Sequence, residues 1–130
     1  MIAGVGVDIV ALRRFAGLEP EDPFFRRSFT ERERAQILAQ PDPMAHFASH
    51  FAGKEAVMKA IHANPAQVRW PEIEILNAAD GRPEVTLSGS ALASAAGNGI
   101  VTVQLSLSWE ADYAVGFAVA EQEDTGAMWL

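Results

Sequence analysis

The chain has 130 residues, and 49% of them are hydrophobic, which suits one domain with a real core and no second domain. Because it has no cysteine, disulfides and thiolate metal sites are excluded, and a bound metal would take oxygen or histidine ligands, with Mg²⁺ as the default. The formal net charge of −7 argues against nucleic acid as the main partner. We expect a cytoplasmic protein that does not bind a membrane, since the amino terminus does not resemble a signal peptide and no apolar run is long enough to span a bilayer.

Basic side chains gather in the first third of the chain, and acidic residues outnumber them in the remainder. The arginines before residue 40 are Arg13, Arg14, Arg26, Arg27, Arg32 and Arg34. They indicate a docking surface for an acidic partner, or alternatively they line helix faces that water solvates. The sequence leaves both interpretations open.

The first strand is expected over residues 2–10, where apolar residues alternate with glycines. One face of this strand would carry Ala3, Val5, Val7 and Ile9, and the other would carry Gly4, Gly6 and Asp8. Glycine inside a strand marks the close approach of a ligand or another backbone, so a carboxylate at the end of the glycine row indicates a binding site. The alternative is that Asp8 caps the helix that follows.

Two helices are predicted next. Thr30, followed three residues later by Glu33, has the capping-box pattern that opens a helix, and this helix would end before Pro41. The second helix is expected over residues 44–62, where apolar residues at spacings of three and four form a core stripe, namely Phe47, Phe51, Met58 and Ile61.

The long helix also carries charged residues whose positions bear on function. Lys54 falls within the apolar stripe. Glu55 and Lys59 are four residues apart, so they lie side by side on the border of the stripe and can reach toward a neighbouring element. Without such a neighbour they would form only a surface ion pair, worth about 0.3–0.5 kcal/mol.

Strands dominate the second half of the chain. We expect one hairpin from strands over residues 72–76 and 84–87, and a second from strands over residues 101–108 and 113–119. A short helix is expected between the hairpins, over residues 90–96. The last strand has a face of small residues that favours tight packing against a helix or against another subunit, namely Ala114, Gly116, Ala118 and Ala120. Residues 121–130 are acidic and lose this periodicity, so we expect a mobile tail.

Four segments in this order resemble those of the holo-(acyl-carrier-protein) synthase family. They are Gly4–Val10, Phe29–Glu31, Phe51–Ala56 with Lys59, and Leu105–Ser108 followed by Asp112–Val115, with Gly81–Pro83 between them. The resemblance implies an α+β fold, the 4′-phosphopantetheinyl transferase fold, in which an antiparallel sheet packs on one long helix. It implies one transferase domain over residues 1–120, before the tail of residues 121–130. It also implies a trimer with interfacial active sites, which Lys54 in the stripe and the small-residue face support, since both need a partner.

The resemblance further implies a reaction. The 4′-phosphopantetheine arm of coenzyme A would pass to a serine of an acyl carrier protein, with 3′,5′-ADP released, for fatty acid or polyketide synthesis. Asp8 and Glu55 would hold Mg²⁺, which prefers carboxylate, phosphate and water oxygens. Lys59 would act at the phosphates, and Glu33 would lie near the serine proton as a second catalytic residue.

The binding residues implied by the resemblance fall into two groups. Those facing coenzyme A would be Lys59, His50, Trp109, Ser108, Arg82 and Pro83. Those facing the carrier protein would be Arg13, Arg14, Phe24 and Phe25.

The chain departs from the family's pattern at three places. Trp109 stands where histidine is usual and cannot carry a positive charge, His50 stands where arginine is usual, and residues 61–65 replace a glycine-rich turn. These departures leave open a second interpretation, in which a catalytically weakened relative binds a carrier protein or coenzyme A as an accessory module. An unrelated α+β enzyme acting on coenzyme A thioesters is a third, although the sequence offers no cysteine, serine elbow or His–Asp pair for it.

Overall fold

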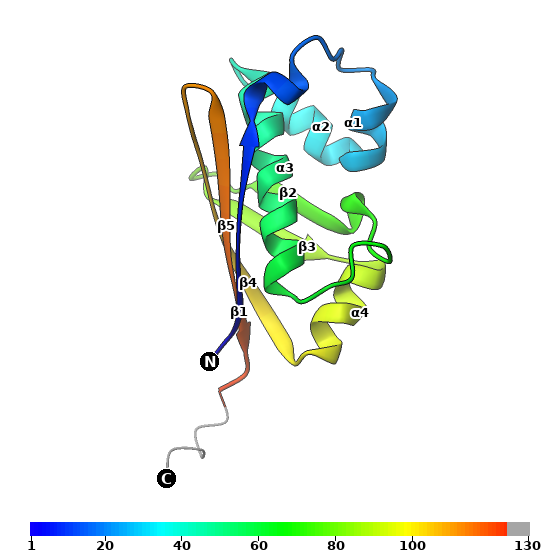
Figure 1. Ribbon diagram of the computed structural model, residues 1–130, viewed down its shortest axis with the longest axis vertical. Helices are drawn as coiled ribbons and strands as arrows, with labels where there is room; N and C mark the ends of the chain where they lie inside the picture. The colour runs from blue at the N-terminus through cyan, green and yellow to red at the C-terminus, as the bar shows by residue number, and fades with distance from the viewer. Residues whose placement is uncertain (125–130) are drawn as a thin grey trace.

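A three-stranded antiparallel sheet lies along one long helix in the computed structural model, which describes residues 1–124 (Figure 1). Strand β5 (Tyr113–Gln122) is central and pairs with β1 (Ile2–Ala11) on one side and β4 (Ile100–Glu110) on the other. Helix α3 (Pro43–Ala60) contacts all three strands. The predicted fold class, α+β with an antiparallel sheet packed on one long helix, is confirmed.

The other elements lie around the remaining sides of α3. A second antiparallel sheet consists of β2 (Ile73–Asn77) and β3 (Pro83–Leu87), and it contacts α3 through β2 and strand β4 through β3. The bounds of the short helices are Pro23–Ser28 for α1, Glu31–Leu38 for α2 and Gly89–Gly97 for α4, and two 3₁₀ turns span Leu12–Phe15 (η1) and Trp70–Glu72 (η2). Among residues 1–124, no helix combines the length and the apolar character needed to cross a membrane.

Side chains placed just before the helices fix where they begin. The Thr30 hydroxyl accepts a hydrogen bond from the Glu33 amide at 3.1 Å, and the Glu33 carboxylate accepts one from the Thr30 amide at 2.8 Å. This reciprocal pair is the predicted capping box. Helix α3 begins similarly, with the Asp42 carboxylate accepting from the Ala45 amide and Pro43 in the first helical position.

Small residues allow the sheet and α3 to meet backbone to backbone. A Cβ atom at Gly6 of β1 would overlap the carbonyl oxygen of Ala56, and one at Gly116 of β5 would lie 2.6 Å from the amide nitrogen of Gly53. The alanines of β5 that alternate with this glycine are fully buried against the helix. The sequence left open whether the small-residue face packs against a helix or against another subunit. It packs against α3 of the same chain.

The opposite face of the three-stranded sheet is apolar and open. Val5, Val7 and Ile9 are 57%, 55% and 61% exposed, and Phe117 and Tyr113 of β5 are exposed beside them. The expectation that Lys54 and the small-residue face require another subunit was therefore wrong, because both find partners within the chain. Among residues 1–124, nothing covers this row of large apolar side chains instead.

An aromatic cluster joins α1, η1 and the first half of α3. Helix α1 was not predicted, because its six residues are too few for an apolar period to show. Phe25 of α1 is fully buried, with its ring centroid 4.3 Å from that of Phe47. The expectation that Phe25 faces the carrier protein was therefore wrong. Phe24 remains half-buried, and it packs against Phe15 and Phe51.

The carboxyl-terminal strand runs past the expected domain boundary at residue 120. Glu121 and Gln122 still belong to β5 and pair with Thr102 and Ile100 of β4. Two residues of the expected tail are thus part of the sheet, and residues 125–130 of that tail lie outside the described residues.

We predict that Gly6→Ala destabilises the protein by about 3 kcal/mol, because the added methyl group would displace the carbonyl of Ala56 and separate β1 from α3. Gly97→Ala is the matched control, since a Cβ atom at this helical position would meet no atom within 4 Å, and it should leave stability unchanged or slightly raised. Urea unfolding followed by circular dichroism gives both values. A Gly6→Ala variant as stable as the control would contradict the backbone contact.

Candidate active site

The contact between β1 and α3 places Asp8, Glu55 and Lys59 side by side. The Lys59 ammonium donates a hydrogen bond to the Val7 carbonyl at 2.9 Å and lies 3.3 Å from Oδ1 of Asp8. The Glu55 carboxyl group lies near enough to Asp8 for the negative charge of Asp8 to raise the pKa of Glu55. Asp8 does not cap the turn that follows β1, because no side chain caps η1. The glycine row of β1 therefore ends in a cluster of charged groups.

The two carboxyl groups are held in an unfavourable arrangement when no cation lies between them. Burial, and after it the hydrogen bond and negative charge of Asp8, raises the pKa of Glu55 to about 7, although Arg14 and Lys59 oppose this shift. Oδ2 of Asp8 is buried and, among the described residues, has no hydrogen-bond partner. Buried carboxylate oxygens without a partner fit a bound divalent cation, which would satisfy both groups.

Within residues 1–124, no group of three or more His, Asp or Glu side chains could enclose a metal ion. The protein can therefore offer a cation two carboxylates, and the remaining ligands would be phosphate oxygens and water. Mg²⁺ typically binds in this way, with one or two carboxylates and several waters or substrate phosphates.

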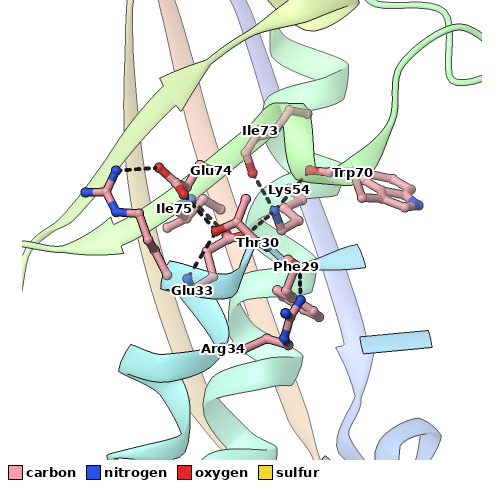
Figure 2. Close-up of polar contacts among 10 residues, drawn as sticks. Phe29, Thr30, Glu33, Arg34, Lys54, Trp70, Ile73, Glu74 and Ile75 are labelled. Atoms are coloured by element: carbon pink, nitrogen blue, oxygen red, sulfur yellow. Dashed lines mark hydrogen bonds and ion pairs between the residues drawn. The ribbon is translucent and has the colours of Figure 1, made fainter. Parts of the chain in front are cut away.

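Glu33 and Lys54 form a fully buried ion pair between α2 and α3 (Figure 2). The Lys54 ammonium donates to Oε1 of Glu33 at 2.9 Å and to the carbonyl oxygens of Trp70 and Ile73. Oε2 of Glu33 accepts from the Ile75 amide at 2.8 Å. All three ammonium hydrogens and both carboxylate oxygens are thus used inside the protein.

This placement does not fit a catalytic Glu33. Its side chain has no exposed surface, and its hydrogen bonds go to Thr30, Lys54 and Ile75, not to Asp8 or Glu55. The sequence singled out Glu33 and Lys54 separately. It did not show that they meet, because 21 residues separate them and only the packing of α2 against α3 joins them.

His50 lies in the first half of α3, and Trp109 lies in β4 near the tip of the β4–β5 hairpin. His50 is buried, Nδ1 has no partner among the described residues, and burial lowers the pKa of the ring to about 4. This uncharged, buried ring does not fit direct contact with coenzyme A. Trp109 is partly exposed and packs edge to face against His46, with ring centroids 4.8 Å apart. Sequence analysis missed His46, although it precedes His50 by one helical turn.

Three further expected contacts of coenzyme A lie apart from Asp8 and Glu55. Arg82 and Pro83 line a pocket of about 430 Å³ between β3, α4 and β4. Ser108 is exposed on the open face of the sheet, opposite Val115 of β5. A single copy of the chain thus brings Asp8, Glu55 and Lys59 together, but not these three residues with them.

Of the two arginines expected to face the carrier protein, Arg14 lies near the carboxyl pair and Arg13 lies beside Tyr113. The guanidinium of Arg14 lies 5.8 Å from the ring centroid of Phe51, and its charge acts on Glu55. The guanidinium of Arg13 lies 6.0 Å from the ring centroid of Tyr113. Both side chains are exposed and form a positively charged rim, which borders the Glu55 carboxyl group through Arg14.

Comparison with known proteins decides which family this geometry belongs to. Residues 4–118 match the family model described as the 4′-phosphopantetheinyl transferase superfamily. The chain belongs to this superfamily. It is a phosphopantetheinyl transferase.

The curated relatives and solved structures agree. A holo-[acyl-carrier-protein] synthase of Desulforudis audaxviator is 42% identical over 122 residues, which cover 92% of this chain and 93% of the relative. One of Caldanaerobacter subterraneus is 39% identical over 117 residues, covering 89% and 92%. The crystal structure of the Neisseria meningitidis synthase superposes with a TM-score of 0.83 at 34% identity, over 94% of this chain and 100% of that one. A Bacillus anthracis synthase in complex with CoA (3′,5′-ADP) has a TM-score of 0.76 at 30% identity, over 95% and 99%.

We predict that Lys54→Met destabilises the transferase by about 3–5 kcal/mol, because it leaves the Glu33 carboxylate buried without its cation. The double variant Lys54→Met with Glu33→Gln removes both charges and should recover most of this loss. Urea unfolding measures both. If the folded double variant transfers phosphopantetheine at least a hundredfold more slowly than the wild type, Glu33 takes part in the chemistry after all.

We also predict that Glu55 makes the metal-free transferase less stable as the pH rises from 4.5 to 7. The folded state keeps the Glu55 proton across this window, whereas the unfolded chain has lost it, so deprotonation favours unfolding. In EDTA at pH 8, Glu55→Gln should therefore raise Tm by about 4 °C. Glu84→Gln, at an exposed position of β3, should leave Tm unchanged. A lower Tm for Glu55→Gln would mean that the carboxylate is stabilising.

Proposed function

We propose that this transferase moves the 4′-phosphopantetheine arm of coenzyme A to a serine of an acyl carrier protein. The observation that carries the proposal is the pair of carboxyl groups of Asp8 and Glu55, which includes a buried oxygen without a partner and lies beside the Lys59 ammonium. The relatives named holo-[acyl-carrier-protein] synthase and the synthase in complex with CoA (3′,5′-ADP) support the acceptor and the donor.

The reaction is a phosphoryl transfer. The serine oxygen forms a bond to the β-phosphorus of coenzyme A, and the bond from that phosphorus to the bridging oxygen breaks. 3′,5′-ADP leaves with the bridging oxygen, and the serine proton passes to solvent. Such reactions depend mainly on positioning and on neutralising phosphate charge, so few reactive side chains are needed.

Each residue of the cluster has a part in this scheme. Asp8 and Glu55 would hold Mg²⁺, and Glu55, whose pKa is raised to about 7, would give up its proton when the ion binds. Bound Mg²⁺ supplies positive charge that stabilises the diphosphate and its leaving group. Lys59, which the Val7 carbonyl holds in place, orients the diphosphate against the carboxylates.

The exposed rim of Arg13 and Arg14 is the proposed docking surface for the carrier protein. Aromatic rings of Tyr113 and Phe51 support the two guanidinium groups, so their position is partly fixed before a partner arrives. Because Arg14 lies near Glu55, an acidic carrier bound here would present its serine close to the diphosphate. Attraction of this kind mainly increases the association rate and orients the partner.

The open apolar face of β1 and β5 is the proposed interface of a homotrimer. Val5, Val7 and Ile9 lie directly across from Val119, Phe117 and Val115, so large apolar side chains cover this face of both strands. Exposed apolar patches of this kind on soluble proteins mark interaction surfaces. A neighbouring copy would bring Ser108, Arg82 and Pro83 to the coenzyme A that Asp8 and Lys59 would hold, which a single copy does not do.

We predict that Asp8→Asn and Glu55→Gln each slow transfer by about a thousandfold while the fold stays intact, because both remove a negative ligand from the proposed Mg²⁺ site. Glu123→Gln, at an exposed position after β5, is the matched control. Apo carrier protein, coenzyme A and Mg²⁺ are incubated with each variant, and the intact mass of the carrier is followed over time. Full activity in either variant would refute the metal assignment. A wild type that binds coenzyme A but transfers nothing would favour the accessory-module interpretation.

We predict a trimer in solution at micromolar concentration, and a monomer for Val7→Lys, since an ammonium group cannot be buried in an apolar interface without a partner. Val101→Lys is the control, because Val101 is equally exposed but lies at the start of β4. Light scattering after size exclusion gives the mass of each variant. A monomeric wild type would contradict the proposed assembly.

A further inference from the structure

His62 ends α3 in a backbone conformation that normally selects glycine. Its φ is 58°, and the amides of His62 and Ala63 donate to the carbonyls of Lys59 and Met58, each at 3.2 Å. These two hydrogen bonds end the helix at a residue in the left-handed conformation. Glycine usually occupies this position. A residue with a Cβ atom costs about 1 kcal/mol there. Persistence of a costly conformation points to a use for the side chain.

The His62 ring lies over the start of β1. Its Nε2 is 3.0 Å from the carbonyl oxygen of Ala3. Gly4 lets the end of α3 approach the strand, because a Cβ atom at that position would overlap the carbonyl oxygen of Ala60 and lie 2.9 Å from Nε2 of His62. The residue remains exposed, so one edge of the ring is anchored on the strand while the other is free to meet a ligand.

Lys59 and His62 reach β1 in the same manner. Lys59 crosses from α3 to the carbonyl of Val7, and His62 crosses one helical turn later to the carbonyl of Ala3. Four strand residues separate the two carbonyls, which is about 13 Å along β1. The ammonium and the imidazole thus form a row that leads away from Asp8 along the line where α3 meets β1.

We propose that His62 binds a phosphate group of coenzyme A. This inference rests on the proposed function, which places the diphosphate at Asp8 and Lys59, the near end of the row. A neutral ring that donates from Nε2 to Ala3 has only an acceptor at Nδ1 and cannot bind phosphate. The imidazolium donates from both nitrogens, one to Ala3 and one to a phosphate oxygen, and such a charge-assisted bond is strong.

Two variants separate this role from helix capping. His62→Asn suits the left-handed conformation and can donate to Ala3, but it has no charge. His62→Lys retains a positive charge but not the conformational preference. If His62 binds phosphate, His62→Asn should weaken binding of 3′,5′-ADP about tenfold at unchanged Tm, and His62→Lys should bind within about threefold of the wild type. Isothermal titration calorimetry in EDTA measures binding without a metal.

The opposite pattern overturns the inference. If His62→Asn binds 3′,5′-ADP as the wild type does, or if both variants lose binding equally, the ring only caps the helix. The source of the phosphate follows from KM values for coenzyme A and 3′-dephospho-coenzyme A. If His62→Asn raises KM for both donors, His62 contacts the diphosphate. If it raises KM for coenzyme A alone, His62 contacts the 3′-phosphate. A wild type that transfers from neither donor refutes the proposed function itself, whereas an active wild type with unaffected variants refutes only the part given to His62.

Discussion

The backbone contact between α3 and the three-stranded sheet is the constraint on which the rest of this protein depends. Gly6 of β1 and Gly116 of β5 have no side chain, so the strands lie directly on the helix. At this distance the short side chain of Asp8 meets Glu55, and the Lys59 ammonium can reach the Val7 carbonyl. A larger residue in the glycine row would separate the two elements and, with them, the charged groups. Fold and site therefore share one packing requirement.

The same close packing determines how the charges behave. Glu55 is partly removed from water and lies beside the negative charge of Asp8, so its pKa is raised to about 7. This arrangement lowers the stability of the folded state, and the cation that we propose would relieve that cost by replacing the Glu55 proton. The pair of Glu33 and Lys54 is more deeply buried but fully satisfied, and it joins α2 and β2 to the helix. One helix thus carries an incomplete polar cluster for function and a complete one for structure.

The open face of the sheet links this architecture to assembly. Because the small residues of β1 and β5 point to α3, their large apolar residues must point away from it. The chain therefore uses both faces of these strands, one for its own helix and one for the surface we propose as an interface between copies. The same alternation places Ser108, which lies opposite Val115, on the open face and not on the face of Asp8.

Local pattern was enough to determine most of the secondary structure and the residues at the centre of the site. The capping box at Thr30, the apolar stripe of α3 and the alternation in β1 are short-range signals, and they gave these elements almost to the residue. Asp8, Glu55 and Lys59 could be singled out because a glycine row and an i, i+4 pair are visible in the sequence, and the family resemblance gave them a chemistry. What α3 packs against could not be read in this way, because that depends on contacts between residues far apart in the chain. Only the tertiary structure decided that Lys54 pairs with Glu33, that the rings of Phe25 and His50 are buried, and that the small-residue face belongs to α3 and leaves the apolar face open, since burial depends on every element that surrounds a side chain.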